Sequence, residues 1–178
     1  MIQTAMSQDV LTRSVTPDDL PAISKLHAHV FGPGRFVRSA YRVREGKGFL
    51  SRFCRVADLG GRLIATLRIT EISIGATGQA ALLGPLAVDP EFAGQGYGRK
   101  LVSESLGNMK TGGLKLVVLV GDESYYGRLG FQPVPLGQIL FSAPVNPGRI
   151  LAAELEAGAL ANYRGLISAA PKADAGKG

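Results

Sequence analysis

Apolar residues near the beginning of the chain predict a strand followed by a helix. Residues 10–15 predict a short first strand, and Thr16 and Pro17 suit the cap and first position of a helix. Four apolar residues then recur at the spacing of one helix face: Leu20, Ile23, Leu26 and Val30. A Gly-Pro-Gly sequence at residues 32–34 predicts the end of this helix, and residues 35–44 predict a second, shorter one.

The next part of the chain predicts a β-hairpin. Residues 49–57 and 62–74 are rich in apolar and β-branched residues, and a glycine-containing turn at 58–61 joins them. Within 62–74 the apolar positions change parity after Ile69. Because side chains alternate between the two faces of a strand, this change predicts a β-bulge.

Three further apolar stretches complete the predicted sheet. Residues 80–88 form a strand that contains Gly84 and Pro85, and because proline donates no ladder hydrogen bond, this strand should lie at an edge or contain a bulge. Residues 114–120 predict another strand, and residues 150–167 predict one or two closing strands. This order of elements predicts an α/β fold, with helices packed on a mixed sheet.

Glycines mark the most informative stretch, which covers residues 86–101 and reads Leu-Ala-Val-Asp-Pro-Glu-Phe-Ala-Gly-Gln-Gly-Tyr-Gly-Arg-Lys-Leu. The alternating Gly94, Gly96 and Gly98 allow positive φ angles and a close approach of the backbone to a ligand. The following residues have helical spacing, and we expect that helix to end near residues 107–108. Backbone N–H groups at such a helix start can bind phosphate.

Two common phosphate-binding patterns do not fit this stretch. The dinucleotide pattern G-x-G-x-x-G would need a glycine where Leu101 stands, and the Walker pattern needs Gly-Lys-Ser/Thr. The stretch instead resembles motif A of the GNAT superfamily of N-acyltransferases, Gln/Arg-x-x-Gly-x-Gly/Ala. Gly96 and Gly98 match this motif, whereas Ala93 stands where Gln or Arg is usual, which weakens one expected pyrophosphate contact.

A second block lies downstream at residues 121–131, which read Gly-Asp-Glu-Ser-Tyr-Tyr-Gly-Arg-Leu-Gly-Phe. It is similar to the Phe-Tyr-x-x-x-Gly-Phe motif of the same superfamily. Tyr125 and Tyr126 occupy the aromatic pair, and a Gly-Phe pair closes the block. Together the two blocks cover about residues 82–131 in the expected order, which makes the combination more specific than either motif alone.

The resemblance implies a GNAT-like fold, in which a mixed, mostly antiparallel sheet has splayed central strands and carries helices on both faces. It also implies acetyl-CoA as the cosubstrate, with the pantetheine arm along the end of the strand and the pyrophosphate on the glycine loop. The cofactor-binding residues expected on this basis are Leu86, Ala87, Val88, Gly94, Gln95, Gly96, Tyr97, Gly98 and Arg99.

The resemblance also implies catalytic roles. Tyr126 is the expected general acid that protonates the departing CoA thiolate, and its alternative role is that of a core aromatic residue; Tyr125 is expected to be the more buried of the pair. The strand before the glycine loop has no carboxylate to serve as general base. Glu71 is therefore a candidate base, as are Asp122 and Glu123, each acting directly or through water.

Charge adds one feature to this description. The chain has 178 residues and a net charge of +6, and its calculated pI is about 9.7. Seven basic residues lie in one segment that contains Glu45 as its only acid: Arg35, Arg38, Arg42, Arg44, Lys47, Arg52 and Arg55. This cluster either attracts an acidic acceptor or an acyl carrier protein, or forms a solvated basic face. Nucleic acid ranks third as a partner, because the interleaved aromatic residues fit core packing equally well.

The remaining sequence features argue against an internal disulfide, a metal site, a signal peptide and a membrane-spanning helix. Cys54 is the single cysteine, so no internal disulfide can form, and we expect it to be a small buried hydrophobic residue. His27 and His29 lie about 200° apart on a helix, so no metal site is expected. The first residues lack the pattern of a signal peptide, and no apolar run approaches the ~18 residues of a membrane helix, so we expect a cytoplasmic protein.

Taken together, these observations predict one domain over residues 1–167 and a mobile tail at 168–178. The predicted activity is transfer of an acetyl group from acetyl-CoA to a primary amine in a ternary complex. No motif identifies the acceptor, which can be a small molecule or a protein amine. The alternatives are transfer from a longer acyl-CoA or an acyl carrier protein, and a non-catalytic CoA-binding or interaction module, which Ala93 favours.

Overall fold

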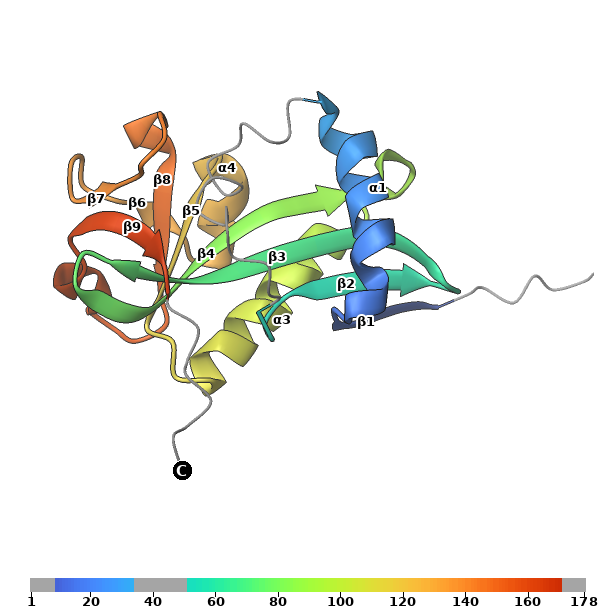
Figure 1. Cartoon of the computed structure of the whole chain (residues 1–178), viewed down its shortest axis with the longest axis horizontal. Helices are drawn as coiled ribbons and strands as arrows, with labels where there is room; N and C mark the ends of the chain where they lie inside the picture. The colour runs from blue at the N-terminus through green and yellow to red at the C-terminus, as the bar shows by residue number, and fades with distance from the viewer. Residues whose placement is uncertain (1–8, 34–50, 171–178) are drawn as a thin grey trace, which may run out of the picture.

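The computed structural model describes residues 9–33 and 51–170, and a single twisted sheet dominates them (Figure 1). Its strands are β1 (Val10–Ser14), β2 (Arg55–Leu59), β3 (Arg62–Ile74), β4 (Thr77–Val88), β5 (Leu116–Val120), β6 (Gln132–Pro133), β7 (Ile139–Leu140), β8 (Ile150–Glu154) and β9 (Gly165–Ala169). The main path runs β1-β2-β3-β4-β5-β8-β6, and β9 pairs with β3 and β7. Within these residues the β4–β5 and β7–β9 pairs are parallel and the others antiparallel, so the mostly antiparallel mixed sheet is confirmed.

Helices cover both faces of this sheet, as expected. Helix α1 (Leu20–Phe31) crosses β3 and β4 on one face, and α3 (Tyr97–Thr111) lies against the other (Figure 1). The short α4 (Glu123–Tyr126) follows β5 directly. Five single turns of 3-10 helix complete the described structure: η1 (Pro17–Asp19), η3 (Pro90–Phe92), η4 (Gly127–Leu129), η5 (Pro147–Arg149) and η6 (Ala159–Asn162).

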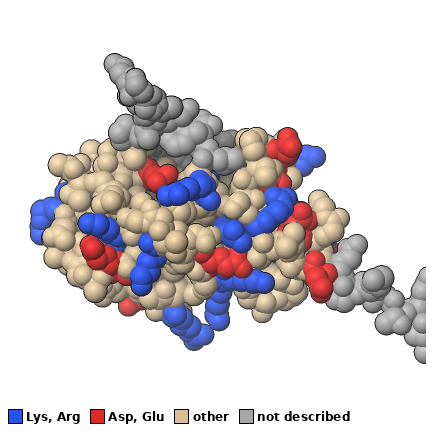
Figure 2. Space-filling model, turned by 90° about the horizontal axis from the view of Figure 1, so that it is seen from below, with Lys and Arg blue, Asp and Glu red and all other residues tan. Residues whose placement is uncertain are grey.

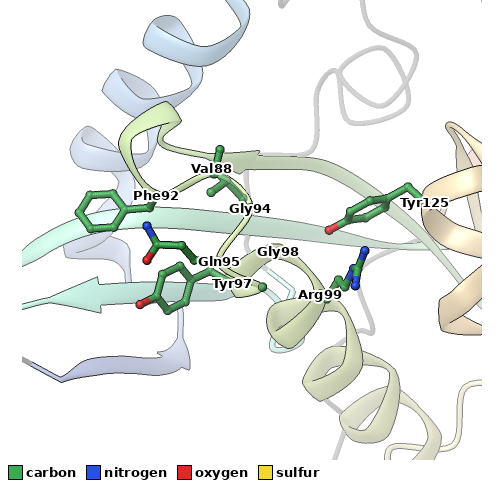
Figure 3. Close-up of a pocket in the computed structure, with 10 residues that line it drawn as sticks. Val88, Phe92, Gly94, Gln95, Tyr97, Gly98, Arg99 and Tyr125 are labelled. Carbon is green, nitrogen blue, oxygen red and sulfur yellow. The ribbon is translucent and has the colours of Figure 1, made fainter.

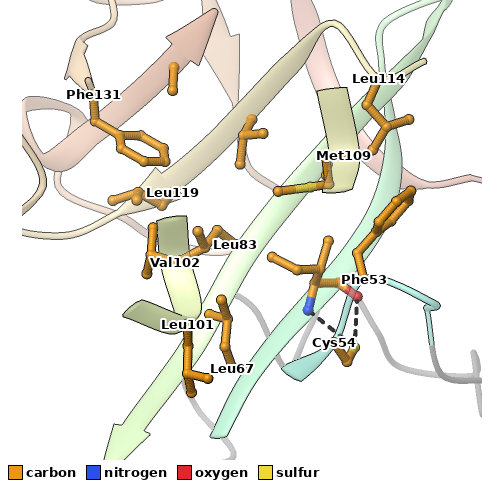
Figure 4. Packing of buried hydrophobic residues seen from close by; sticks show 14 of the residues in the cluster. Phe53, Cys54, Leu67, Leu83, Leu101, Val102, Met109, Leu114, Leu119 and Phe131 are labelled. Atoms are coloured by element: carbon orange, nitrogen blue, oxygen red, sulfur yellow. Dashed lines mark hydrogen bonds between the residues drawn. The ribbon is translucent and has the colours of Figure 1, made fainter. Parts of the chain in front are cut away.

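Two hydrophobic clusters occupy the two faces. The first joins α3 to the sheet, and Figure 4 shows Leu101, Val102 and Met109 of α3 packed beside Leu67, Leu83 and Leu119. Alternate residues of the same strands build the second cluster with the C-terminal segment: Ile72, Ile74, Ala80, Leu82, Leu116, Val118, Tyr163 and Ile167. The central strands are therefore buried on both faces.

The strand pairing corrects the position of the bulge predicted in β3. Ala57 pairs with Ala65 and Asp58 with Leu63, so the extra residue of β3 is Ile64 and does not follow Ile69. Pairing with β4 is regular from Ile69↔Leu83 to Ile72↔Ala80, so β3 contains no extra residue there. The parity of the apolar positions changes because Leu67 and Ile69 face the α3 cluster, whereas Ile72 faces the opposite one. A strand that buries different faces along its length gives the same sequence pattern as a bulge.

The irregularity predicted in β4 is confirmed as a bulge. Leu67 pairs with Leu86 and Ile69 pairs with Leu83, so β4 holds one extra residue around Gly84-Pro85. β4 also parts from β5 near this point, because their pairing runs only from Ala80↔Leu116 to Leu82↔Val118. The edge of β4 beyond Leu82 therefore faces a gap between two central strands.

The boundaries of several elements differ from those predicted. β2 begins at Arg55, because Ser51 and Cys54 form a turn in which the Cys54 N–H donates to the Ser51 carbonyl at 3.2 Å. Helix α3 continues past residues 107–108 to Thr111. β9 runs to Ala169, so its pairing with β3 extends two residues beyond the expected end of the domain at 167. The single-domain organisation stays a prediction, and the second predicted helix, at 35–44, lies outside the described residues.

Cys54 is buried, as predicted. Its Sγ accepts the Ile69 N–H at 3.3 Å and lies 3.4 Å from the Ile69 carbonyl oxygen, as the dashed lines in Figure 4 show. The thiol thereby links the turn before β2 to the backbone of β3. No helix within residues 9–33 and 51–170 is long and apolar enough to cross a membrane.

The start of α1 is held by a buried carboxylate. Asp19 accepts hydrogen bonds from the Thr16 N–H at 2.8 Å and from two nitrogens of Arg13 at 2.7 and 2.8 Å. The Arg13 guanidinium is the main reason that the pKa of Asp19 lies well below its ordinary value, and the Thr16 N–H adds to it. β1, η1 and α1 are thereby fixed together.

Asp19 should make stability depend on acid pH. Because its folded pKa is depressed, its contribution is complete above the unfolded pKa of about 3.9 and is lost as the pH falls further toward the folded pKa. We expect Asp19→Asn to lower the unfolding free energy by about 2 kcal/mol at pH 7, the size of a charge-assisted hydrogen bond. Urea unfolding of both proteins between pH 7 and pH 2 should show the difference narrowing below pH 4; a constant difference would contradict this role.

Candidate functional site

A charged turn positions the glycine loop at the end of β4. Asp89 caps η3 by accepting the Glu91 N–H at 3.0 Å, and Arg62 donates to Asp89 at 2.8 Å and to Glu91 at 2.6 Å. The pKa of Asp89 is lowered first by the Glu91 N–H and then by Arg62. These bonds tie the turn to the first residue of β3 and so fix the direction in which the chain leaves β4.

The loop then opens α3 with several unsatisfied N–H groups. Gly94 and Gly96 have φ angles of 75° and 87°, a region that side chains with a Cβ rarely adopt. Gly96 is the N-cap, and the first amide to donate into the helix is that of Lys100, 3.0 Å from the Gly96 carbonyl. The amides of residues 97–99 therefore have no acceptor within the helix and lie at the positive end of its dipole.

These amides border a cavity of about 480 Å³ between the loop, the end of β4 and α4 (Figure 3). Seven of the nine residues predicted to bind the cofactor line it: Val88, Gly94, Gln95, Gly96, Tyr97, Gly98 and Arg99. Phe92, Ala93 and Tyr125 line it as well. The other two predicted residues, Leu86 and Ala87, do not line the cavity. Leu86 is half-buried against the α3 cluster, and Ala87 is buried.

Gly98 allows α3 to approach β4 and α4 closely. A Cβ at this position would lie 2.8 Å from the Tyr125 hydroxyl oxygen, 3.3 Å from Val88 Cγ2 and 3.4 Å from Leu86 Cδ2. The first of these distances is shorter than real Cβ contacts allow. The absence of a side chain at Gly98 therefore keeps the floor of the cavity open.

Tyr125 lines the cavity, although it was not among the predicted site residues. The motif offset assigned the functional role to Tyr126, yet Tyr125 projects toward Gly98 and Arg99 in Figure 3. The Arg99 guanidinium carbon lies 5.7 Å from the Tyr125 ring centroid. Burial raises the pKa of the Tyr125 phenol, and the Arg99 charge opposes that rise in part. Tyr125 is thus a neutral hydrogen-bond donor at neutral pH.

Tyr126 does not line the cavity. Its ring packs against the α3 cluster, 5.7 Å from the Phe131 ring and 4.8 Å from the Tyr125 ring. Gly121 makes room for it, because a Cβ there would lie 2.8 Å from Tyr126 Cε2. The two tyrosines are both half-buried, so the expected contrast in burial between them is not observed.

The three candidate bases occupy different places. Glu71 is half-buried in β3, opposite Ala81, and strand alternation puts its side chain on the α3 face with Ile69. Asp122 is exposed at the start of α4 and accepts a hydrogen bond from Arg149 at 3.2 Å. Glu123 is exposed in α4. None of the three lines the cavity in the described part of the chain.

The basic cluster is only partly described. Arg35, Arg38, Arg42, Arg44 and Lys47 lie outside the described residues. Arg52 is exposed over the Phe53 ring, and Arg55 is paired with Glu104 at 2.7 Å. On the face shown in Figure 2, Lys and Arg side chains are interspersed with Asp and Glu, an arrangement typical of a solvated mixed surface.

Comparisons with known proteins agree with this geometry. Residues 12–134 match the family model described as an acetyltransferase (GNAT) domain. YhbS of Escherichia coli (strain K12), named as an uncharacterized N-acetyltransferase, is 32% identical over 124 residues, which are 69% of this chain and 74% of that protein.

Solved structures of GNAT family proteins also resemble this chain. The crystal structure of E. coli YhbS in complex with CoA has a TM-score of 0.78 and 28% identity, and the match covers 90% of this chain and 89% of that one. A GNAT family acetyltransferase from Brucella melitensis in complex with acetyl-CoA shares the fold, with a TM-score of 0.63, 24% identity and coverage of 82% and 96%. The chain belongs to the GNAT superfamily and is an acetyl-CoA-dependent N-acetyltransferase.

Proposed function

We propose that this protein transfers the acetyl group of acetyl-CoA directly to a primary amine, with both substrates bound at once. The observation that carries the proposal is the 480 Å³ cavity at the start of α3, which includes Val88 at the end of the β4 edge that β5 leaves unpaired beyond Leu82. We place the phosphate-binding amides and the open strand edge on one continuous path for the ligand. A long, flexible anion such as acetyl-CoA fits that path.

The chemistry of the cavity supports a diphosphate ligand. The amides of residues 97–99 lack helical acceptors, and the nearby Arg99 has no ion-pair partner within the described residues. Backbone N–H groups at a helix start bind phosphate oxygens without a large change in geometry. We place the pyrophosphate on residues 94–99.

The open edge of β4 supports the place of the pantetheine arm. Beyond Leu82 this edge faces the gap to β5, while the other edge of β4 is paired with β3 up to Val88. An extended amide-containing chain can add to such an edge as a strand does. We place the arm beside Leu86, Ala87 and Val88, with its sulfur toward the bulge at Gly84-Pro85.

The reaction then needs little more than positioning and one proton donor. Bound acetyl-CoA supplies the activated thioester. An uncharged acceptor amine forms the new C–N bond as the C–S bond breaks, and the bonding electrons leave with sulfur. We propose that the Tyr126 hydroxyl gives its proton to this sulfur, and that Glu71 accepts the amine proton through water.

The proposal is tested by measuring binding and transfer separately. We expect calorimetry to show acetyl-CoA binding, and a thiol assay to show CoA release that increases with a panel of primary amines. Binding without transfer to any amine would favour a non-catalytic module. Failure to bind acetyl-CoA would overturn the assignment of the cavity itself.

A further inference from the structure

One half-buried arginine has no carboxylate partner in the described part of the chain. Arg13, Arg55 and Arg68 are the half-buried arginines among residues 9–33 and 51–170. Arg13 is paired with Asp19 and Asp58, and Arg55 with Glu104. The Arg68 side chain is in no ion pair or hydrogen bond with a described residue. The other two arginines are paired with carboxylates, so the guanidinium of Arg68 is the one among the three that is available to a ligand.

Arg68 lies in the strand next to the proposed reaction point. Its neighbours pair as Leu67↔Leu86 and Ile69↔Leu83, so Arg68 lies opposite the bulge at Gly84-Pro85. That bulge follows directly after Leu82, where β4 parts from β5. Adjacent strands are about 4.8 Å apart, so an arginine side chain from this position can reach the gap.

The side chain of Arg68 leaves β3 on the face opposite to α3. Leu67 and Ile69 belong to the α3 cluster, so the alternation of the strand directs Arg68 to the α1 face. Arg68 also lines a surface hollow with Leu20 and Ile23 of α1, and Val15 and Cys54 border the same hollow on the β2 side of β3. Strand alternation thus puts Arg68 on the α1 face, whereas α3, whose start follows the cofactor loop, covers the other face of the sheet (Figure 1).

Thr70 provides a second, independent observation on the same face. Its hydroxyl oxygen is buried and has no hydrogen-bond partner among the described residues. Thr70 is two residues from Arg68, so both side chains leave β3 on the same side. A buried hydroxyl without a partner costs about 1–3 kcal/mol, and a bound ligand that supplies an acceptor would remove this cost.

We infer that the acceptor is a primary amine that also carries an oxyanion, a carboxylate or a phosphate. The Arg68 guanidinium binds that group, the Thr70 hydroxyl donates to it, and the amine is held toward the gap between β4 and β5. The planar guanidinium matches both kinds of oxyanion through paired N–H bonds. This inference rests on the proposed acetyl transfer and specifies its substrate class.

Matched acceptors test the inference. We expect amino acids to be acetylated with a lower KM than their carboxamides, or O-phosphoethanolamine with a lower KM than ethanolamine; the pair that differs identifies the oxyanion. Arg68→Gln should raise the KM for the acidic acceptor 10- to 100-fold and leave that for its neutral counterpart and for acetyl-CoA unchanged. Arg68→Lys should be intermediate, and Arg164→Gln, at an exposed position, should behave as wild type.

Thr70→Val separates a ligand role from a structural one. Removing an unpartnered buried hydroxyl should leave the melting temperature equal or raise it, while the KM for the acidic acceptor rises several-fold. Two results would overturn the inference and leave the proposed function intact. One is acetyl transfer with the same KM for acidic and neutral acceptors. The other is an equal rise in KM for both acceptors of a pair in Arg68→Gln. Absence of transfer to every amine would overturn both.

Discussion

Replacing Tyr126 with phenylalanine is expected to lower kcat about 100-fold, with the KM for acetyl-CoA within about twofold of wild type. A positioned general acid contributes about 10²–10⁴-fold to a rate, and the hydroxyl is the only group removed. The ring still fills the space above Gly121 and beside Phe131, so the fold should be kept. Steady-state kinetics with a saturating amine, together with a melting curve, would measure both effects.

Tyr125→Phe is the matched control, because it makes the same chemical change one residue away. The Tyr125 hydroxyl lies next to Gly98 in the cavity, where we place the phosphates. We therefore expect a KM for acetyl-CoA about 10- to 100-fold higher, from the loss of one hydrogen bond to a charged group, and little change in kcat. The reverse pattern, with kcat lost in Tyr125→Phe alone, would move the role of general acid to Tyr125.

Gly98→Val is expected to weaken acetyl-CoA binding about 100-fold. A Cβ at this position meets the Tyr125 hydroxyl at 2.8 Å, and two further methyl groups extend the clash toward Val88 and Leu86. The start of α3 must move away from β4, and the loss of one or two charge-assisted hydrogen bonds accounts for a change of this size. Calorimetry with acetyl-CoA measures the effect without requiring turnover.

Gly107→Ala provides the control within the same helix. A Cβ there has no neighbour within 4 Å, so the substitution should only favour the helix, by about 0.5–1 kcal/mol, and leave acetyl-CoA affinity unchanged. Equal affinities for the Gly98 and Gly107 variants would contradict the assignment of the cavity. A Gly98→Val protein that fails to fold would shift the comparison to Gly98→Ala, whose methyl group makes the same first contact.

Local signals explain what the sequence predicted well. Thr16 and Pro17 mark the start of the first helical turn, and Gly94 and Gly96 adopt the positive φ angles that their spacing indicated. Pro85 lies at the bulge of β4 because a residue without an N–H cannot continue a regular ladder. Each of these features is decided by the residue itself and its near neighbours.

Features decided by distant residues were not predictable in this way. The parity change in β3 comes from the C-terminal segment, which covers Ile72 on the face opposite to α3. The place of Tyr125 depends on how closely Gly98 lets α3 approach α4, and the face of Glu71 depends on which side α3 covers. Helix α3 passes Gly107 because Met109 is fully buried against the sheet, and this burial outweighs the low helix propensity of glycine.

The pairing of β9 with β3 has a consequence for how the chain folds. Ala169 pairs with Ile72 and Ile167 with Ile74, so this part of β3 can complete its pairing only after the much later residues 167–169 have been synthesised. Until then Ile72, Ile74 and Leu82 have no C-terminal cover, and pairings between such distant segments form slowly. A nascent chain released before residue 165 would leave these apolar side chains exposed, so it should bind chaperones or aggregate.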